Sequence, residues 1–98
     1  MKSKKTVNKK NPIKKRIPQN KKFVLADGKI ISNIKELAME IENMQDNIFY
    51  HHVNENKNDF ANWIKDVIKE IKLAENLMTI KEKQEFELKL LKHIVKNI

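Results

Sequence analysis

The spacing of apolar and polar residues divides the chain after residue 22. Beyond this point apolar residues recur at regular intervals, whereas residues 1–22 hold only a few of them: Met1, Val7, Ile13 and Ile17. Pro12 and Pro18 also interrupt any helix in this segment and favour extended backbone. So few apolar side chains cannot bury enough surface for the segment to fold by itself. We therefore predict a disordered tail, residues 1–22, followed by one folded domain, residues 23–98.

The folded domain is expected to begin with a small β-hairpin or an extended turn. In the stretch "FVLADGKIIS", two short apolar runs flank Asp27-Gly28, and Asp-Gly is a strong signal for a hairpin turn. Gly28 is the only glycine in the chain, which is consistent with a position that needs a positive φ. Because an isolated hairpin is only marginally stable, this element, from Phe23 to Ile31, must pack against helices.

Two helices are predicted next. In "SNIKELAMEIENM", Ser32 or Asn33 can cap the first helix, and Glu36 stands in capping-box position. The apolar residues of this helix recur at helical spacing and form one face: Ile34, Leu37, Ala38, Ile41 and Met44. A second, shorter helix is expected to open with Asp46 as its cap and to turn Ile48, Phe49 and Val53 inward.

A third helix is expected after the loop at residues 54–57, with Asn58 or Asp59 as its cap. Its inward face comprises Phe60, Trp63, Ile64, Val67, Ile68 and Ile71. Thr79 with Glu82 then makes a capping box for a long last helix that runs from Ile80 to the end of the chain. The sequence thus predicts a mainly α fold, in which a hairpin or extended turn precedes a compact domain of three to four helices.

The last helix is apolar over an unusually wide arc. Its apolar residues spread over about 200° of the helical wheel, which is more than one core contact needs: Phe86, Leu88, Leu90, Leu91, Ile94, Val95 and Ile98. Either the helix is wedged between two elements, or its second apolar strip meets a partner. A protein partner or a second copy of the chain could therefore bind through residues 80–98.

Positive charge is concentrated in the predicted tail. The chain has 21 Lys and Arg against 13 Asp and Glu. Ten of these basic residues precede the first acid, Asp27, which leaves residues 23–98 with 11 basic and 13 acidic side chains. The ten are Lys2, Lys4, Lys5, Lys9, Lys10, Lys14, Lys15, Arg16, Lys21 and Lys22. The whole basic excess therefore belongs to the tail, and the folded domain is slightly acidic.

Nucleic acid is the partner that we expect for such a tail, because neutralising phosphates releases condensed counterions. The tail has no aromatic residue and only one arginine, so it can follow a phosphate backbone but lacks the side chains that usually read bases. An anionic membrane, an acidic protein or a solvated spacer are the alternatives. The membrane is disfavoured because the tail lacks the apolar face of an interfacial helix.

The densest group of polar and aromatic residues is "HHVNENKNDFANWI", residues 51–64. A zinc site needs about four converging ligands, but His51 and His52 are adjacent and diverge on a helix or strand. The only other histidine is His93, and there is no cysteine. Serine is confined to Ser3 and Ser32, so no nucleophile stands beside a base. We predict no catalytic residue, metal or cofactor here, and expect a structural or docking corner formed by His51, His52, Asn54, Asn58, Asp59 and Trp63.

Three stretches resemble an uncharacterised family of small domains of unknown function, found mainly in archaea. They are "FVLADGKIISNIKELAMEIENM", "IFYHHVNENKNDFANWIKDV" and "LAENL". The hallmark of the family resembles the motifs F-x-L-x-D-G, N-x-x-E-L and H-V-N-x-x-x-N-D-F-A-x-W-I, in this order. The resemblance covers residues 23–77 and leaves out the tail and the helix after Thr79. It implies a shared helical fold, supplies no catalytic residues, and marks residues 51–64 as a family-defining corner or a shared docking surface.

These observations lead to one preferred function. No apolar run approaches the ~20 residues of a membrane span, the first residues lack the apolar core of a secretory signal, and the absence of cysteine fits a reducing compartment. We expect a soluble, cytoplasmic, non-enzymatic accessory protein that associates with nucleic acid, in a ribosome or ribonucleoprotein. Ribosomal RNA is favoured over DNA because no recognition-helix pattern is present. The alternatives are a protein–protein interaction module, self-associating through the last helix, and a nucleoid DNA-binding protein.

Overall fold

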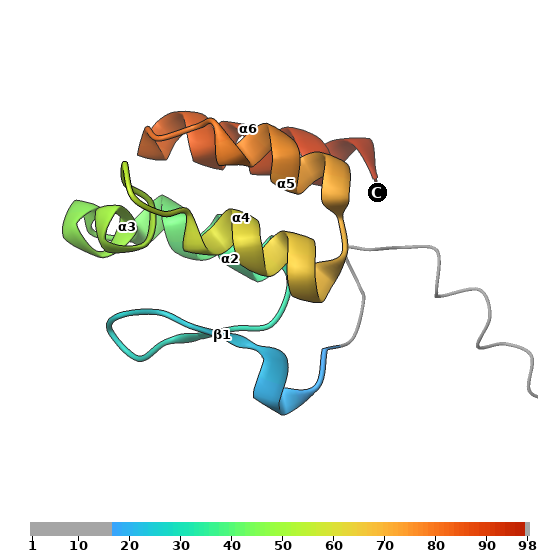
Figure 1. Cartoon of the computed structure of the whole chain (residues 1–98), viewed down its shortest axis with the longest axis horizontal. Helices are drawn as coiled ribbons and strands as arrows, with labels where there is room; N and C mark the ends of the chain where they lie inside the picture. Colours follow the sequence, from blue (N-terminus) through green and yellow to red (C-terminus); the bar gives the residue numbers. More distant parts are fainter. Residues whose placement is uncertain (1–16, 98) are drawn as a thin grey trace, which may run out of the picture.

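The computed structural model describes residues 17–97, which form a mostly helical body with one small hairpin (Figure 1). The order of elements is the 3-10 turn η2 (Gln19–Lys21), β1 (Phe23–Val24), β2 (Ile30–Ile31), α2 (Ile34–Asn43), α3 (Asp46–His52), α4 (Asp59–Trp63), the π-helical segment η3 (Ile64–Ile68), α5 (Ile71–Met78) and α6 (Lys83–Lys96). Figure 1 shows α5 and α6 on one side of α2 and α4, with the hairpin on the other. The predicted fold class is confirmed.

The hairpin forms where the sequence predicts it. β1 and β2 are antiparallel, with Phe23 opposite Ile31 and Val24 opposite Ile30. The connecting loop is closed by backbone hydrogen bonds, of which the Gly28 N–H to the Leu25 carbonyl is 2.8 Å long. Gly28 has a φ of 95°, a conformation that glycine adopts without steric penalty. The prediction of a turn that requires this single glycine is therefore confirmed.

Helix α2 begins with the predicted capping arrangement. Asn33 is the N-cap, and its side-chain oxygen accepts a hydrogen bond from the Glu36 N–H at 2.8 Å. The Glu36 carboxylate in turn accepts from the Ser32 N–H at 2.7 Å. These two bonds satisfy backbone donors that the first helical turn leaves without intrahelical partners. They orient a buried face of Ile34, Leu37, Ala38 and Ile41.

The predicted cap of the next helix is wrong, whereas that of α4 is correct. The N-cap of α3 is Gln45, which makes no side-chain capping bond, and Asp46 is the first helical residue. The Asp46 carboxylate instead pairs with Lys83 at 3.0 Å. Helix α4 is capped by Asn58, whose side-chain oxygen accepts from the Ala61 N–H at 3.0 Å.

The third helix does not run through to Ile71 as the sequence pattern predicted. Helix α4 continues into η3, which ends at Lys69 with a left-handed φ of 70°. The Ile64 carbonyl accepts from the Lys69 N–H and, at 3.2 Å, from the Glu70 N–H. The chain then turns into α5, an element that the sequence analysis missed, and Ile71 is 47% exposed. No glycine or proline marks this break in the sequence.

The last helix starts later than predicted. Thr79 ends α5, and its hydroxyl donates to the Asn76 carbonyl at 3.3 Å. The N-cap of α6 is Glu82, whose carboxylate accepts from the Glu85 N–H at 3.3 Å. The predicted capping box of Thr79 with Glu82 is therefore wrong, although Glu82 does belong to the helix start. One face of α6 is buried through Phe86, Leu90 and Ile94.

Aromatic side chains from four of the elements meet in the core. The ring centroid of Phe60 lies 5.1 Å from that of Phe23, 6.0 Å from that of Phe49 and 5.8 Å from that of Phe86. These contacts join β1, α3, α4 and α6 around one centre. Each fully buried aromatic ring stabilises the fold by about 1.5–3 kcal/mol relative to an exposed one.

The body starts earlier in the chain than the predicted boundary at Phe23. Ile17 is partly buried against the core, η2 follows it, and the Lys21 carbonyl accepts a hydrogen bond from the Trp63 indole at 2.9 Å. Residues 17–22 of the predicted tail therefore lie against the body. The other predicted tail residues, Lys2 to Arg16 among them, lie outside the described residues.

Candidate functional site

The predicted corner centres on His52, a buried histidine at the end of α3. Its Nε2 accepts a hydrogen bond from the Ala26 N–H at 3.0 Å, and its Nδ1 lies 2.9 Å from Asp59 Oδ2. Because Nε2 is an acceptor, the ring proton is on Nδ1 and is donated to the carboxylate. The neutral ring thus links the hairpin loop to the first residue of α4.

Asp59 is the charged member of this pair. Partial burial raises the pKa of its carboxyl, but the hydrogen bonds from His52 and Lys57 and the charge of Lys57 outweigh this effect and hold the pKa below its usual value. The Lys57 ammonium lies 3.0 Å from the same oxygen, Oδ2. Asp59 is therefore ionised near neutral pH, and His52 Nε2 already accepts a backbone proton donor. Both ring nitrogens of His52 and Oδ2 of Asp59 are thus engaged within the fold.

Asn58 and Trp63 also use their polar atoms within the fold. Asn58 is 3% exposed, and its amide nitrogen donates to the Leu77 carbonyl at 3.0 Å while its oxygen caps α4. The bond to Leu77 fixes the end of α5 against the start of α4. Trp63 holds the Lys21 segment through its indole N–H. Both residues stabilise the packing of elements that are distant in sequence.

The remaining corner residues shape the loop between α3 and α4. Asn54 donates from its amide to the Tyr50 carbonyl at 3.0 Å and accepts from the Asn56 N–H at 2.9 Å. His51 is exposed, and its ring centroid lies 4.8 Å from that of His52. The structure thus brings His52 and Asp59 into contact. Five of the six predicted corner residues have polar atoms bonded within the fold: His52, Asn54, Asn58, Asp59 and Trp63. A docking role for this corner stays a prediction.

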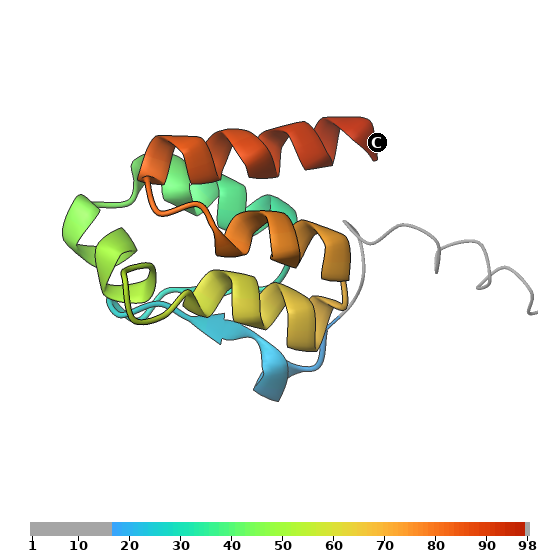
Figure 2. The same cartoon turned by 45° about the horizontal axis from the view of Figure 1, so that its top comes forward.

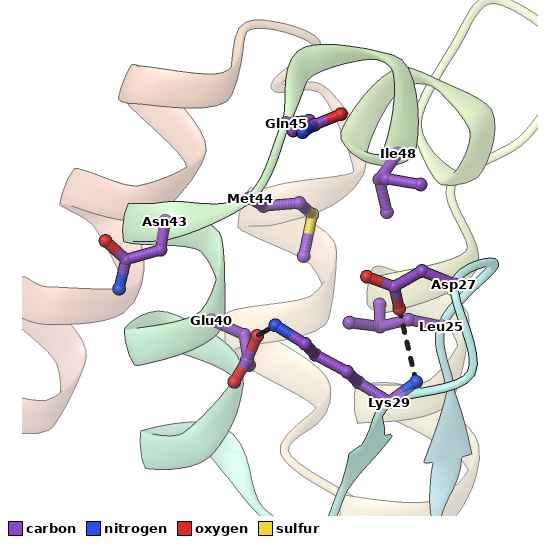
Figure 3. Close-up of a pocket in the computed structure, with 8 residues that line it drawn as sticks. All are labelled: Leu25, Asp27, Lys29, Glu40, Asn43, Met44, Gln45 and Ile48. Atoms are coloured by element: carbon purple, nitrogen blue, oxygen red, sulfur yellow. Dashed lines mark hydrogen bonds and ion pairs between the residues drawn. The ribbon is translucent and has the colours of Figure 1, made fainter.

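A surface hollow of about 280 Å³ lies between the hairpin loop, the end of α2 and the start of α3 (Figure 3). Its charged side chains have partners within the hollow. Lys29 Nζ lies 3.5 Å from Glu40 Oε1, and Asp27 accepts from the Lys29 N–H at 3.1 Å. Met44 and Ile48 contribute apolar surface. The hollow contains no pair of nucleophile and base, and the sequence analysis did not select any of its residues as functional.

A second groove, of about 230 Å³, lies between α5 and α6 and is rich in lysine. Lys72 of α5 faces three lysines of α6, and Glu70 is the single acid among the lining residues. Glu70 lies 3.9 Å from His93 Nε2, and among the described residues no ion pair involves any of the four lysines. They make up four of the eleven lysines after residue 22: Lys72, Lys89, Lys92 and Lys96. This groove is the candidate anion-binding surface of the body.

Sequence reasoning missed the groove because it missed α5, which supplies one wall. A local signal was present, since Lys89, Lys92 and Lys96 are three and four residues apart and so share one side of a helix.

No metal-binding cluster occurs within residues 17–97, because nowhere there do three or more His, Asp or Glu side chains come together. None of the helices within the described range combines the length and apolar character needed to cross a bilayer.

Comparison with known proteins relates the second half of the chain to an uncharacterised family. Residues 53–98 match a model described as "Family of unknown function (DUF5752)". The match and the resemblance noted in the sequence share residues 53–77. The family model extends through α6, which the resemblance left out, and does not include the hairpin or α2. No curated protein and no solved structure matches the chain significantly.

Proposed function

We propose that the protein is a non-enzymatic accessory factor that binds the phosphate backbone of RNA within a ribosome or another ribonucleoprotein. The observation that carries this proposal is the concentration of ten basic residues, without an acid, in residues 1–22. A segment that neutralises six or more phosphates gains most of its affinity from the release of counterions. Lysine supplies this charge without the planar geometry that reads base edges, so the binding is independent of base sequence.

The lysine groove supports this proposal as a second cationic surface. The first described residues, the start of α5 and the last turn of α6 lie at the same end of the molecule in both views of the ribbon (Figure 2). The first described residues therefore lie at the end of the body where Lys72 and Lys96 line the groove. RNA is preferred to DNA because a proline-containing lysine segment suits a crevice between the phosphates of a folded RNA.

The proposal is tested by removing charge without disturbing the body. Because residues 17–22 pack on Trp63 and the core, deletion should stop at residue 16. The sharper variant keeps the full length and replaces eight cations by glutamine: Lys2, Lys4, Lys5, Lys9, Lys10, Lys14, Lys15 and Arg16. Its matched control carries Lys35→Gln, Lys65→Gln and Lys69→Gln, which neutralise exposed lysines outside the groove.

Binding would be measured by fluorescence anisotropy with a folded ribosomal RNA fragment and with duplex DNA of equal length, over a range of salt concentrations. The variant with eight glutamine substitutions should bind RNA at least about a hundredfold more weakly at low salt, and its affinity should depend much less on the salt concentration. The control should bind almost as the unmodified chain does. Unchanged RNA binding by the variant with eight substitutions would overturn the proposal. Equal affinity for DNA would overturn the preference for RNA.

A further inference from the structure

Helix α6 carries a second apolar strip that the fold does not use. Leu88 is 52% exposed, Leu91 42% and Val95 69%. They lie on the side of α6 turned away from its buried residues, and with the stems of Lys92 and Lys96 they border a hollow of about 400 Å³. Single exposed apolar residues are ordinary, but a contiguous strip of large aliphatic side chains marks a surface that another molecule covers. This strip is called the outer strip below.

The spacing within the outer strip indicates what kind of element covers it. Leu88, Leu91 and Val95 are separated by three and then four residues, and Gln84 stands one interval earlier. Alternating intervals of three and four form the seam of a coiled coil, in which each side chain fits between residues of a facing helix of the same period. A helix is therefore the natural occupant, and the other copy of α6 has the required spacing.

The order of charges along α6 fits a second copy in the opposite direction. Both acids of α6, Glu85 and Glu87, lie in the first half of the helix with Lys83 and Lys89, whereas the second half has Lys92 and Lys96 and no acid. An antiparallel copy places Glu85 of one helix level with the basic second half of the other and also pairs opposite ends of the helix dipoles. When Leu88 of one copy faces Leu91 of the other, Glu85 comes beside Lys92, and the twofold axis produces this pair twice.

We propose that two copies of the protein associate as a symmetric antiparallel dimer through the outer strip of α6. The interface is isologous, because the same strip serves both copies. A single pair of short helices buries less surface than a standard stable interface, so the association is weak and depends on concentration, with a Kd of about 10–100 µM. The Gln84 position of each copy faces Val95 of the other and closes the seam at both ends.

The dimer would add avidity to the proposed function, and this consequence alone rests on that function. Two copies of residues 1–22 would be held on one assembly, so that the second tail binds at a high effective concentration. The dimer itself requires no nucleic acid. Dimerisation is therefore measured without nucleic acid and at high salt. Under these conditions the absence of a dimer says nothing about RNA binding, and the absence of RNA binding in the other assay says nothing about the dimer.

Sedimentation equilibrium of the full chain tests the association and the role of the strip. The unmodified chain should approach dimer mass as its concentration rises, and Leu91→Glu should weaken the association at least about tenfold, because it places a charge in each copy's seam. The control is Met39→Glu, which changes another exposed apolar residue, on α2, and should leave the Kd unchanged. A chain that stays monomeric at the highest concentration, or a Leu91→Glu variant that dimerises normally, would overturn the proposal.

Charge reversal and cross-linking test the direction of the pair. Glu85→Lys and Lys92→Glu should each weaken the dimer, and the double variant should restore it. Since the chain has no cysteine, Gln84→Cys and Val95→Cys can be oxidised after mixing. The antiparallel dimer gives the mixed disulfide, whereas a parallel dimer gives disulfides between identical variants. Identical-variant disulfides, or no restoration by the double variant, would refute the antiparallel arrangement. A different protein on the strip would leave all these variants monomeric.

Discussion

Replacing His52 by phenylalanine should destabilise the protein without changing its fold. The ring of His52 is 5% exposed and lies among aromatic rings, with centroid distances of 5.1 Å to Phe23 and 5.2 Å to Phe60. A phenyl ring is also flat and aromatic, though one ring atom larger, and can keep these contacts. It cannot accept from the Ala26 N–H or donate to Asp59, so the substitution removes two hydrogen bonds and little packing.

The expected loss in the free energy of unfolding follows from these two bonds. A partly buried N–H that loses its acceptor costs about 1–3 kcal/mol, and loss of a bond to a charged carboxylate costs about 1.5–3 kcal/mol. Asp59 keeps Lys57 as a partner, which favours the lower half of the second range. The more apolar ring recovers roughly 1 kcal/mol. We therefore expect a net loss of about 2–4 kcal/mol, a large part of the stability of a small domain.

Urea denaturation at neutral pH measures this loss. Trp63 is the only tryptophan of the chain and reports on the core, while far-ultraviolet circular dichroism reports on the helices. The matched control is His51→Phe, which changes the exposed neighbour and should alter stability by less than about 0.5 kcal/mol. Equal stability of the two variants would refute the role assigned to the His52 hydrogen bonds. So would a double-mutant cycle with Asp59→Asn that shows no coupling.

Two further predictions concern neighbouring side chains. Asn58→Ala should lower the free energy of unfolding by about 2–3 kcal/mol in the same urea assay. The Ala61 N–H loses its capping acceptor and the Leu77 carbonyl loses a buried donor. The control Asn62→Ala, on the exposed side of α4, should change the free energy of unfolding by less than about 0.5 kcal/mol. The pKa of Asp59 is lower in the folded than in the unfolded chain. Its ionised carboxylate therefore contributes fully to stability above the unfolded pKa of about 3.9, and this contribution is lost as the pH falls through the folded pKa. Asp59→Asn should flatten the pH dependence of stability below about pH 4, and an unchanged slope in acid-titrated urea unfolding would contradict this.

The elements that the sequence predicts correctly have local causes. The turn at Gly28 depends on one residue's freedom to adopt a positive φ. The start of α2 depends on Asn33 and Glu36, three residues apart, and the start of α4 depends on Asn58 in the same way. Each of these bonds closes within a few residues, so the spacing in the sequence contains the information needed to predict it.

The elements that the sequence analysis misplaced are fixed by distant contacts. Lys69 adopts a left-handed conformation that glycine or asparagine would normally mark, so the break before α5 has no local signal. Helix α5 exists because its buried residues pack on neighbouring helices: Leu73, Ala74 and Leu77. Asp46 fits an N-cap equally well by pattern, but its carboxylate pairs instead with Lys83 of α6.

The candidate site, too, was predictable from the sequence only where its contacts are local. The sequence pointed to residues 51–64 as unusual, and their concentration of asparagine and aspartate indicated caps and turns. The link between His52 and Ala26 spans 26 positions of the chain, and the groove of Lys72 and Lys96 joins two helices. Neither arrangement follows from spacing along the chain.

The sequence by itself determined the charge distribution, the hairpin turn and the amphipathic helices, because these depend on composition and on intervals of a few residues. Only the tertiary structure decided which side of α6 is buried, since Phe86 and Leu88 are equally apolar in the pattern. Packing places Phe86 in the aromatic core and leaves Leu88 52% exposed. The physical reason is that burial depends on the elements that lie opposite a helix, and the spacing of residues within the helix does not specify them.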